Sequence, residues 1–72
     1  MDIDIHLGGR LRDRRLLLNW TQGELGIAIG VGSRQIQKYE CGLIGMSASR
    51  LWRLSQALDV SLSYFYAGLE DR

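Results

Sequence analysis

A chain of 72 residues is long enough for one small domain, which buries only about 60% of the surface that its unfolded chain exposes. The lone cysteine, Cys41, excludes an intrachain disulfide, and no apolar stretch of about 18 residues is present to span a membrane. The net charge is only +1, yet residues 10–53 contain eight basic and three acidic side chains, a balance typical of a phosphate-facing patch or of an ordinary solvated surface. The acidic amino-terminal residues lack the basic region of a signal peptide, so we expect a cytoplasmic protein.

Residues 1–6 are predicted to form a flexible N-terminal arm, and the first helix is predicted over residues 7–18. Leu7, Leu11 and Leu18 recur at helical spacing, and Asn19 accepts the left-handed conformation that ends many helices. This helix contains a run of four arginines: Arg10, Arg12, Arg14 and Arg15. Helical spacing sends them in different directions, so we expect only one or two of them to reach phosphates.

Each later helix has a matching start signal, the hydrophobic staple, in which the apolar residue before the N-cap packs on the residue five positions later. The four N-caps are Thr21, Gly32, Ser47 and Ser61, flanked by the pairs Trp20/Leu25, Val31/Ile36, Met46/Leu51 and Val60/Phe65. Ser and Thr accept a backbone N–H at an N-cap, and Glu24 completes a capping box with Thr21. With Gly30, Gly42 and Gly68 as stop signals, we predict helices over 22–29, 33–41, 48–58 and 62–67, followed by a C-terminal tail over 69–72.

The second and third predicted helices are joined by the very short link Gly30-Val31-Gly32. Two helices tied in this way cross steeply, so the third can protrude while the second braces it. This is the geometry with which a helix-turn-helix, here residues 21–41, places its second helix in the major groove of DNA. No window alternates strictly enough to predict a strand. The sequence therefore predicts an all-α fold, a compact bundle of five helices over residues 7–68.

Three groups of residues occur in a characteristic order. They are Thr21-Gln22-x-Glu24-Leu25 with Gly30-Val31, then Ile36-x-Lys38-Tyr39-Glu40-x-Gly42, then Ser47-Ala48-Ser49-Arg50-Leu51 with Leu58-Asp59-Val60 and Tyr64-Phe65. In this order and spacing they resemble the phage repressor and Cro-like (XRE) family, over residues 7 to 68. The resemblance implies the lambda-repressor-like fold and a transcriptional regulator that acts as a homodimer on double-stranded DNA, at a roughly palindromic operator and without a cofactor.

The resemblance also implies roles for individual residues. Because Ile36 and Tyr39 point inward, the outward residues that would read bases are Ser33, Arg34, Gln35 and Lys38. Arg suits guanine and Gln suits adenine, whereas Gln37 is expected to lie further from the groove. The residues expected to contact phosphates or set position are Gln22, Gly32, Arg10 and Arg14. Arg15 and Glu40 fall where the family places an interior ion pair.

Several residues depart from the family pattern. Gly32 stands where a Ser or Thr cap is usual, and Gly23 and Gly26 lie inside the second helix, where each costs about 0.5–1 kcal/mol relative to Ala. Segment 41–46 is apolar where the family commonly offers cationic or amide side chains. The residues expected at a dimer or partner surface are Leu43, Ile44, Trp52, Tyr64 and Tyr66, although the three aromatic residues could instead pack in the core. These departures favour an alternative, a protein-interaction module such as an antitoxin or anti-activator with weak or lost DNA binding.

The remaining candidates for chemistry are few. His6 has no metal-binding residue at ligand spacing, so we expect a solvated side chain. No phosphate loop, nucleophile elbow or acid–base constellation is present, so the sequence predicts neither an enzyme nor a metal, cofactor or small-molecule site. A single-stranded nucleic acid binder would need Trp52 or Tyr66 exposed for base stacking.

Overall fold

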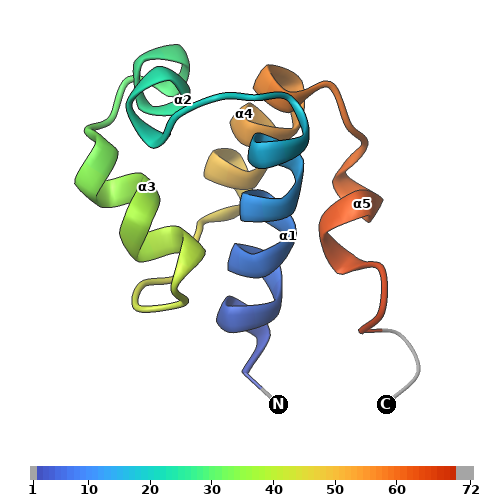
Figure 1. Ribbon diagram of the computed structural model, residues 1–72. Coiled ribbons are helices and arrows are strands. Elements are labelled where there is room, and N and C mark those ends of the chain that lie inside the picture. Colours follow the sequence, from blue (N-terminus) through green and yellow to red (C-terminus); the bar gives the residue numbers. More distant parts are fainter. Residues whose placement is uncertain (1, 70–72) are drawn as a thin grey trace.

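Five helices form the computed structural model, which describes residues 2–69. They are α1 (Ile3–Leu17), α2 (Gln22–Ile29), α3 (Ser33–Glu40), α4 (Ala48–Leu58) and α5 (Leu62–Tyr66), and no strand occurs within these residues (Figure 1). In Figure 1, α3 and α5 lie on opposite sides of α1. Within residues 2–69, no helix is long and apolar enough to cross a membrane. The predicted all-α, five-helix architecture is confirmed.

The predicted helix boundaries depend on local capping, and the structure contains most of these caps. The capping box is complete, because Thr21 Oγ1 accepts from the Glu24 N–H at 3.0 Å and Glu24 Oε1 accepts from the Thr21 N–H at 2.8 Å. Ser47 caps α4, whereas Gly32 and Ser61 make no side-chain capping bond. All four predicted stop residues have positive φ, and Asp59 is a fifth that the sequence did not reveal: Asn19 at 61°, Gly30 at 81°, Gly42 at 73°, Gly68 at 95° and Asp59 at 56°.

The predicted flexible arm is wrong for residues 3–6, which form the first turn of α1. Asp2 is the N-cap, and its Oδ1 accepts from the Asp4 N–H at 2.8 Å. Ile5 lies against Gly42, where a Cβ atom would come within 2.9 Å of the Ile5 backbone. The first turn is therefore held by a cap and by packing on the turn after α3. Residue 1 of the predicted arm, and residues 70–72 of the predicted tail, lie outside the described part of the chain.

The hydrophobic core gathers one face from every helix. Its buried members are Leu7, Leu11, Leu25, Ile29, Ile36, Tyr39, Leu51, Leu54, Leu58 and Phe65. The outer staple residues, Trp20, Val31, Met46 and Val60, are partly buried and pack against this core. Of the three leucines that recur at helical spacing in the first predicted helix, Leu7 and Leu11 are buried and Leu18 is only partly buried. The residues at the start of four helices therefore add to the core, as expected of hydrophobic staples.

Gly26 has a steric reason to be glycine, which differs from its expected role as a simple cost to α2. A Cβ atom at this position would overlap the carbonyl oxygen of Val31 and lie 3.3 Å from the carbonyl carbon of Gly32. The Gly26 carbonyl also accepts from the Val31 N–H at 2.8 Å. The close approach of α2 to the following turn therefore depends on the missing side chain. Gly23 is different, because a Cβ there would meet only Thr21 Oγ1, at 3.8 Å.

Alanine substitutions at these two glycines should have opposite effects on stability. Gly23→Ala should raise the free energy of unfolding by about 0.5–1 kcal/mol, because it removes a helix-interior glycine without a clash. Gly26→Ala should lower it by about 1–3 kcal/mol, because the backbone at Val31 and Gly32 has to shift. Urea unfolding of both variants and the parent chain measures the difference. Equal stabilisation by both would show that the turn after α2 is not tightly packed.

Candidate nucleic-acid interface

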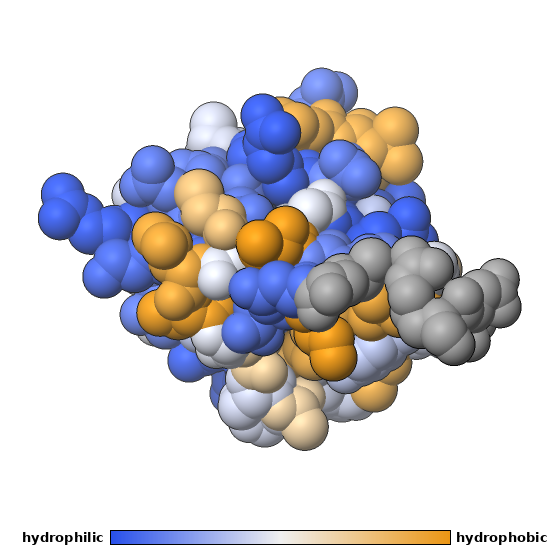
Figure 2. Space-filling model, turned by 90° about the horizontal axis from the view of Figure 1, so that it is seen from below, coloured by the Kyte–Doolittle hydropathy of each residue, from blue (hydrophilic) through white to orange (hydrophobic). Residues whose placement is uncertain are grey.

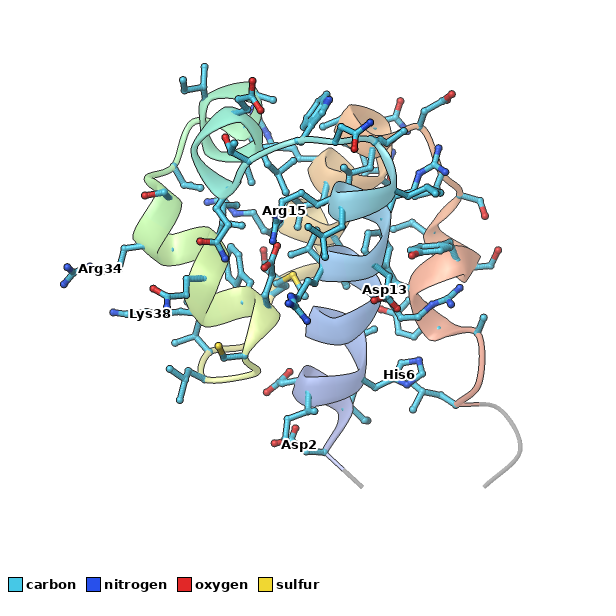
Figure 3. The ribbon with its side chains drawn as sticks, in the orientation of Figure 1. Asp2, His6, Asp13, Arg15, Arg34 and Lys38 are labelled. Atoms are coloured by element: carbon cyan, nitrogen blue, oxygen red, sulfur yellow. The ribbon has the colours of Figure 1, made fainter. Side chains whose placement is uncertain are left out.

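One side of α3 is exposed and polar, and it faces away from the other helices. Ile36 and Tyr39 are buried, with 0% and 4% of their surfaces exposed, and they anchor α3 to the core. The exposed residues of the helix are Ser33, Arg34, Gln37 and Lys38. Figure 3 shows Arg34 and Lys38 projecting from α3 away from the bundle. We call these four exposed residues the outer row of α3. Its two cationic side chains, Arg34 and Lys38, have no partner among residues 2–69.

Gln35 and Gln37 exchange the places that the sequence predicted for them. Gln35 is half-buried, and its Nε2 donates to the Tyr39 hydroxyl at 2.8 Å, along the helix. Gln37 is exposed on the outer row, although it was expected to lie further from the groove. Three of the four predicted base-reading residues, Ser33, Arg34 and Lys38, therefore have no side-chain partner among residues 2–69, whereas Gln35 uses one N–H of its amide in the bond to Tyr39.

A buried polar cluster fixes α3 to α1 and α2. Arg15 Nε donates to Glu40 Oε2 at 2.6 Å and Arg15 Nη2 to Glu40 Oε1 at 3.0 Å, so the predicted ion pair is present and bidentate. Arg15 Nη1 donates to the Trp20 carbonyl at 2.9 Å, and Gln22 Nε2 donates to Glu40 Oε1 at 3.0 Å. Figure 3 shows Arg15 between α1 and α3. The hydrogen bond that Arg15 donates to Glu40 raises the pKa of Arg15 above its usual value, so the guanidinium stays charged.

The structure does not bring Arg10 and Arg14 to α3, where phosphate contacts were expected. Arg10 Nε donates to the Tyr64 carbonyl at 2.8 Å, and its guanidinium carbon lies 3.9 Å from the centre of the Tyr64 ring. Arg14 Nε donates to the Leu58 carbonyl at 2.9 Å, and Arg14 Nη2 donates to the Asp59 carbonyl at 3.3 Å. Both side chains satisfy carbonyls at the ends of α4 and α5. Their face of α1 packs on these helices, so both guanidinium groups already have partners within the protein, and their role toward phosphates stays a prediction.

Gly32 is the N-cap residue before α3, and it offers no side chain to the first N–H groups of the helix. The first N–H groups of a helix have no partner within the helix, and the helix dipole makes them attractive to anions. No acidic side chain occupies the first turn of α3. The amino end of α3, next to Arg34, therefore has no acidic side chain that would repel a phosphate group.

The residues predicted for a partner surface lie on several elements and differ in exposure. Leu43 is 74% exposed and Ile44 is 37% exposed, in the loop between α3 and α4. Figure 2 views the end of the molecule formed by this loop and the start of α1, and shows apolar groups separated by hydrophilic ones. Trp52 on α4 and Tyr66 on α5 are exposed, whereas Tyr64 packs on the core and donates its hydroxyl to the Arg10 carbonyl at 2.7 Å. Tyr64 is therefore a structural residue.

His6 has a structural contact that the sequence did not reveal. Its Nε2 lies 2.8 Å from the Ala67 carbonyl oxygen, so the ring connects α1 to the residue that follows α5 and is not simply solvated. Within residues 2–69, no group of three His, Cys, Asp or Glu side chains is placed to hold a metal ion.

Comparison with known proteins finds a family and several relatives. The family model described as Helix-turn-helix (HTH_3) matches residues 11–65. An uncharacterized HTH-type transcriptional regulator of Sinorhizobium medicae is 48% identical over 64 residues, which are 89% of this chain and 46% of that protein. An uncharacterized transcriptional regulator in the ATPase CF(0) region of Rhodospirillum rubrum is 47% identical over 68 residues, 94% of this chain and 63% of that protein. The chain thus spans roughly half the length of the relatives it matches.

Two solved structures are similar over most of both chains. The P22 c2 repressor, crystallised in complex with a synthetic operator, has a TM-score of 0.79 and 34% identity, covering 86% of this chain and 94% of that chain. The restriction-modification controller protein C.AhdI from Aeromonas hydrophila has a TM-score of 0.82 and 25% identity, covering 89% of this chain and 91% of that chain. The lambda-repressor-like fold is therefore shown by sequence and by structure.

Removing one partner of the buried ion pair should be costly. Arg15→Ala leaves the Glu40 carboxylate buried without its counter-charge, so the free energy of unfolding should fall by about 3–5 kcal/mol. The double variant Arg15→Met with Glu40→Leu should recover most of this loss, because apolar replacements of similar size often match a buried pair. Arg12→Ala is the matched control, since Arg12 lies on the same helix, is exposed and has no partner among residues 2–69. Thermal and urea unfolding compare the three variants, and equal losses for Arg15→Ala and Arg12→Ala would contradict the assignment.

Proposed function

Because the chain belongs to the Helix-turn-helix (HTH_3, Cro/C1-type) family of transcriptional regulators, which are not enzymes, we propose that it binds double-stranded DNA sequence-specifically as a dimer and regulates transcription in the cytoplasm. The observation that best supports this proposal is the exposed outer row of α3, on a helix whose other side is held by Ile36, Tyr39 and the buried Arg15–Glu40 pair. A rigidly held helix of this kind can enter a major groove without losing its orientation.

The chemistry of α3 supports particular contacts. Arg34 can donate two hydrogen bonds to O6 and N7 of a guanine, and Lys38 can serve a base or a phosphate. Ser33 at the start of α3 reads an adjacent base. Gln35 joins them with its Oε1 and its second amide hydrogen, which the bond to Tyr39 does not use and which suit the donor and acceptor of an adenine. Gln22 and the open N–H groups after Gly32 hold phosphates and set the register.

The dimer is proposed from the geometry of DNA. Two copies on a roughly palindromic operator would place their α3 helices in major grooves about 34 Å apart, one helical turn along the duplex. The similar P22 c2 repressor was crystallised with a synthetic operator, which supports a DNA-bound arrangement of this fold. Trp52 and Tyr66, 55% and 43% exposed, remain the aromatic candidates for contacts between copies.

One observation favours a second candidate function, a protein-interaction module of the antitoxin or anti-activator kind. Leu43 is largely exposed beside Ile44, directly after the helix proposed to read DNA, and segment 41–46 has no cationic residue. An exposed apolar group rimmed by polar residues is typical of a protein contact. If this is the main function, the chain binds its partner through residues 43–46 and has no preference among duplex sequences.

Selection of bound duplexes from a random library separates the two candidates. A DNA regulator should enrich a roughly palindromic sequence, and Arg34→Ala should weaken binding to it by about 1–3 kcal/mol and relax the preference at one base pair. Arg34→Lys is the matched control for charge, because it retains the attraction to phosphates and loses the two-bond contact to guanine. A library that shows no enriched sequence would refute sequence-specific binding, and an unchanged preference in Arg34→Ala would refute the role of Arg34.

A further inference from the structure

The cationic side chains of residues 2–69 fall into two groups. Arg10, Arg14 and Arg15 donate to groups on other helices or loops, and Arg50 donates to the Ile29 carbonyl at 3.4 Å. The cationic residues with no hydrogen bond or ion pair within the described residues are Arg12, Arg34, Lys38 and Arg53. Arg34 and Lys38 belong to the outer row of α3, so the function proposed above leaves two unpaired arginines without a role.

Arg12 lies on the edge of α1 that borders α3. Ile5 and Arg12 are seven residues apart, so they lie in one row along the helix, and Ile5 packs on Gly42 directly after α3. The residues four before and three after Arg12 contact α3 directly. A Cβ atom at Gly8 would lie 2.8 Å from the Glu40 carbonyl oxygen, and Arg15 pairs with the Glu40 side chain. Arg12 is therefore an exposed cation along the border between α1 and the carboxyl half of α3.

No acidic residue lies at helical pairing distance from Arg12. The residues three and four positions away on either side are Gly8, Gly9, Arg15 and Leu16. Gln22, which is proposed to hold a phosphate, reaches the same border, because its amide donates to Glu40. Segment 41–46 offers no cation to this end of α3. Arg12 is thus the cation of α1 that is both unpaired and on the α3 side.

We propose that Arg12 binds a phosphate of the DNA strand that borders α3 on the α1 side. This inference rests on the function proposed above and gives Arg12 the role that the sequence predicted for Arg10 and Arg14. With α3 in the groove, the phosphates of one strand run past the α1 edge, where the long guanidinium side chain can reach them while Gln22 supplies an amide nearby. The contact carries no base information, so it sets position and non-specific affinity.

Binding to a fluorescein-labelled duplex of random sequence tests the inference without knowledge of the operator. Fluorescence anisotropy is measured for the parent chain, Arg12→Ala, Arg12→Lys and Arg53→Ala over a series of salt concentrations. Arg53→Ala is the matched control, because Arg53 is also exposed and unpaired but lines a hollow between α2 and α4 to which α3 contributes no residue. Thermal unfolding checks that the variants remain folded.

We expect Arg12→Ala to weaken binding several-fold at low salt and to reduce the slope of log affinity against log salt concentration by about 0.9, the value for one phosphate contact. Arg12→Lys should restore the parent slope, and Arg53→Ala should leave it unchanged. If the parent chain binds with a steep slope and Arg12→Ala has the same slope, the inference is overturned while DNA binding stands. If the parent chain does not bind the random duplex at any salt concentration, the inference is overturned, because the proposed contact does not depend on sequence; the library selection described above then decides the proposed function by itself.

Discussion

The orientation of α3 depends on one buried carboxylate. Glu40, with 8% of its surface exposed, accepts hydrogen bonds from Arg15 on α1 and from Gln22 at the start of α2. Arg15 in turn donates to the Trp20 carbonyl in the turn between α1 and α2. A buried ion pair contributes little net stability, but its bidentate geometry permits one relative placement of its two helices. The cluster therefore determines how α3 is presented, whereas the apolar core determines whether the chain folds.

Close backbone contacts complete this arrangement. Gly8 lets α1 approach the carboxyl end of α3, and Gly26 lets α2 approach the turn that leads into α3. At both positions a Cβ atom would overlap a backbone carbonyl oxygen. Side chains can change rotamer, but backbone atoms yield only when a whole helix moves. Gly8 thus allows close packing at the carboxyl end of α3, and Gly26 allows it at the turn before α3. Together with the Glu40 cluster, these contacts fix the direction in which the outer row of α3 points.

The features that the sequence predicted correctly are those that depend on local interactions. The capping box of Thr21 and Glu24, the left-handed residues Asn19 and Gly30 and the staples all act within a few residues, so their signals are visible in the chain. The arginines of α1 show where this reasoning ends. Periodicity indicates that Arg10 and Arg12 point in different directions, but which of them faces α3 depends on which helices pack on α1. The same holds for Gly26, whose missing side chain is required by a neighbour five residues away and not by α2 itself.

The division of the cations also means that the charge of residues 10–53 overstates the number of cationic side chains available to a ligand. Of eight basic residues between positions 10 and 53, four satisfy acceptors inside the protein and serve the fold. Arg34 and Lys38 remain on α3, and segment 41–46 adds no charge beside them. Non-specific binding comes from phosphate contacts, so few outward cations give weak non-specific affinity. Under the function proposed above, base contacts and the joining of two half-sites by a second copy would have to supply the remaining affinity for an operator.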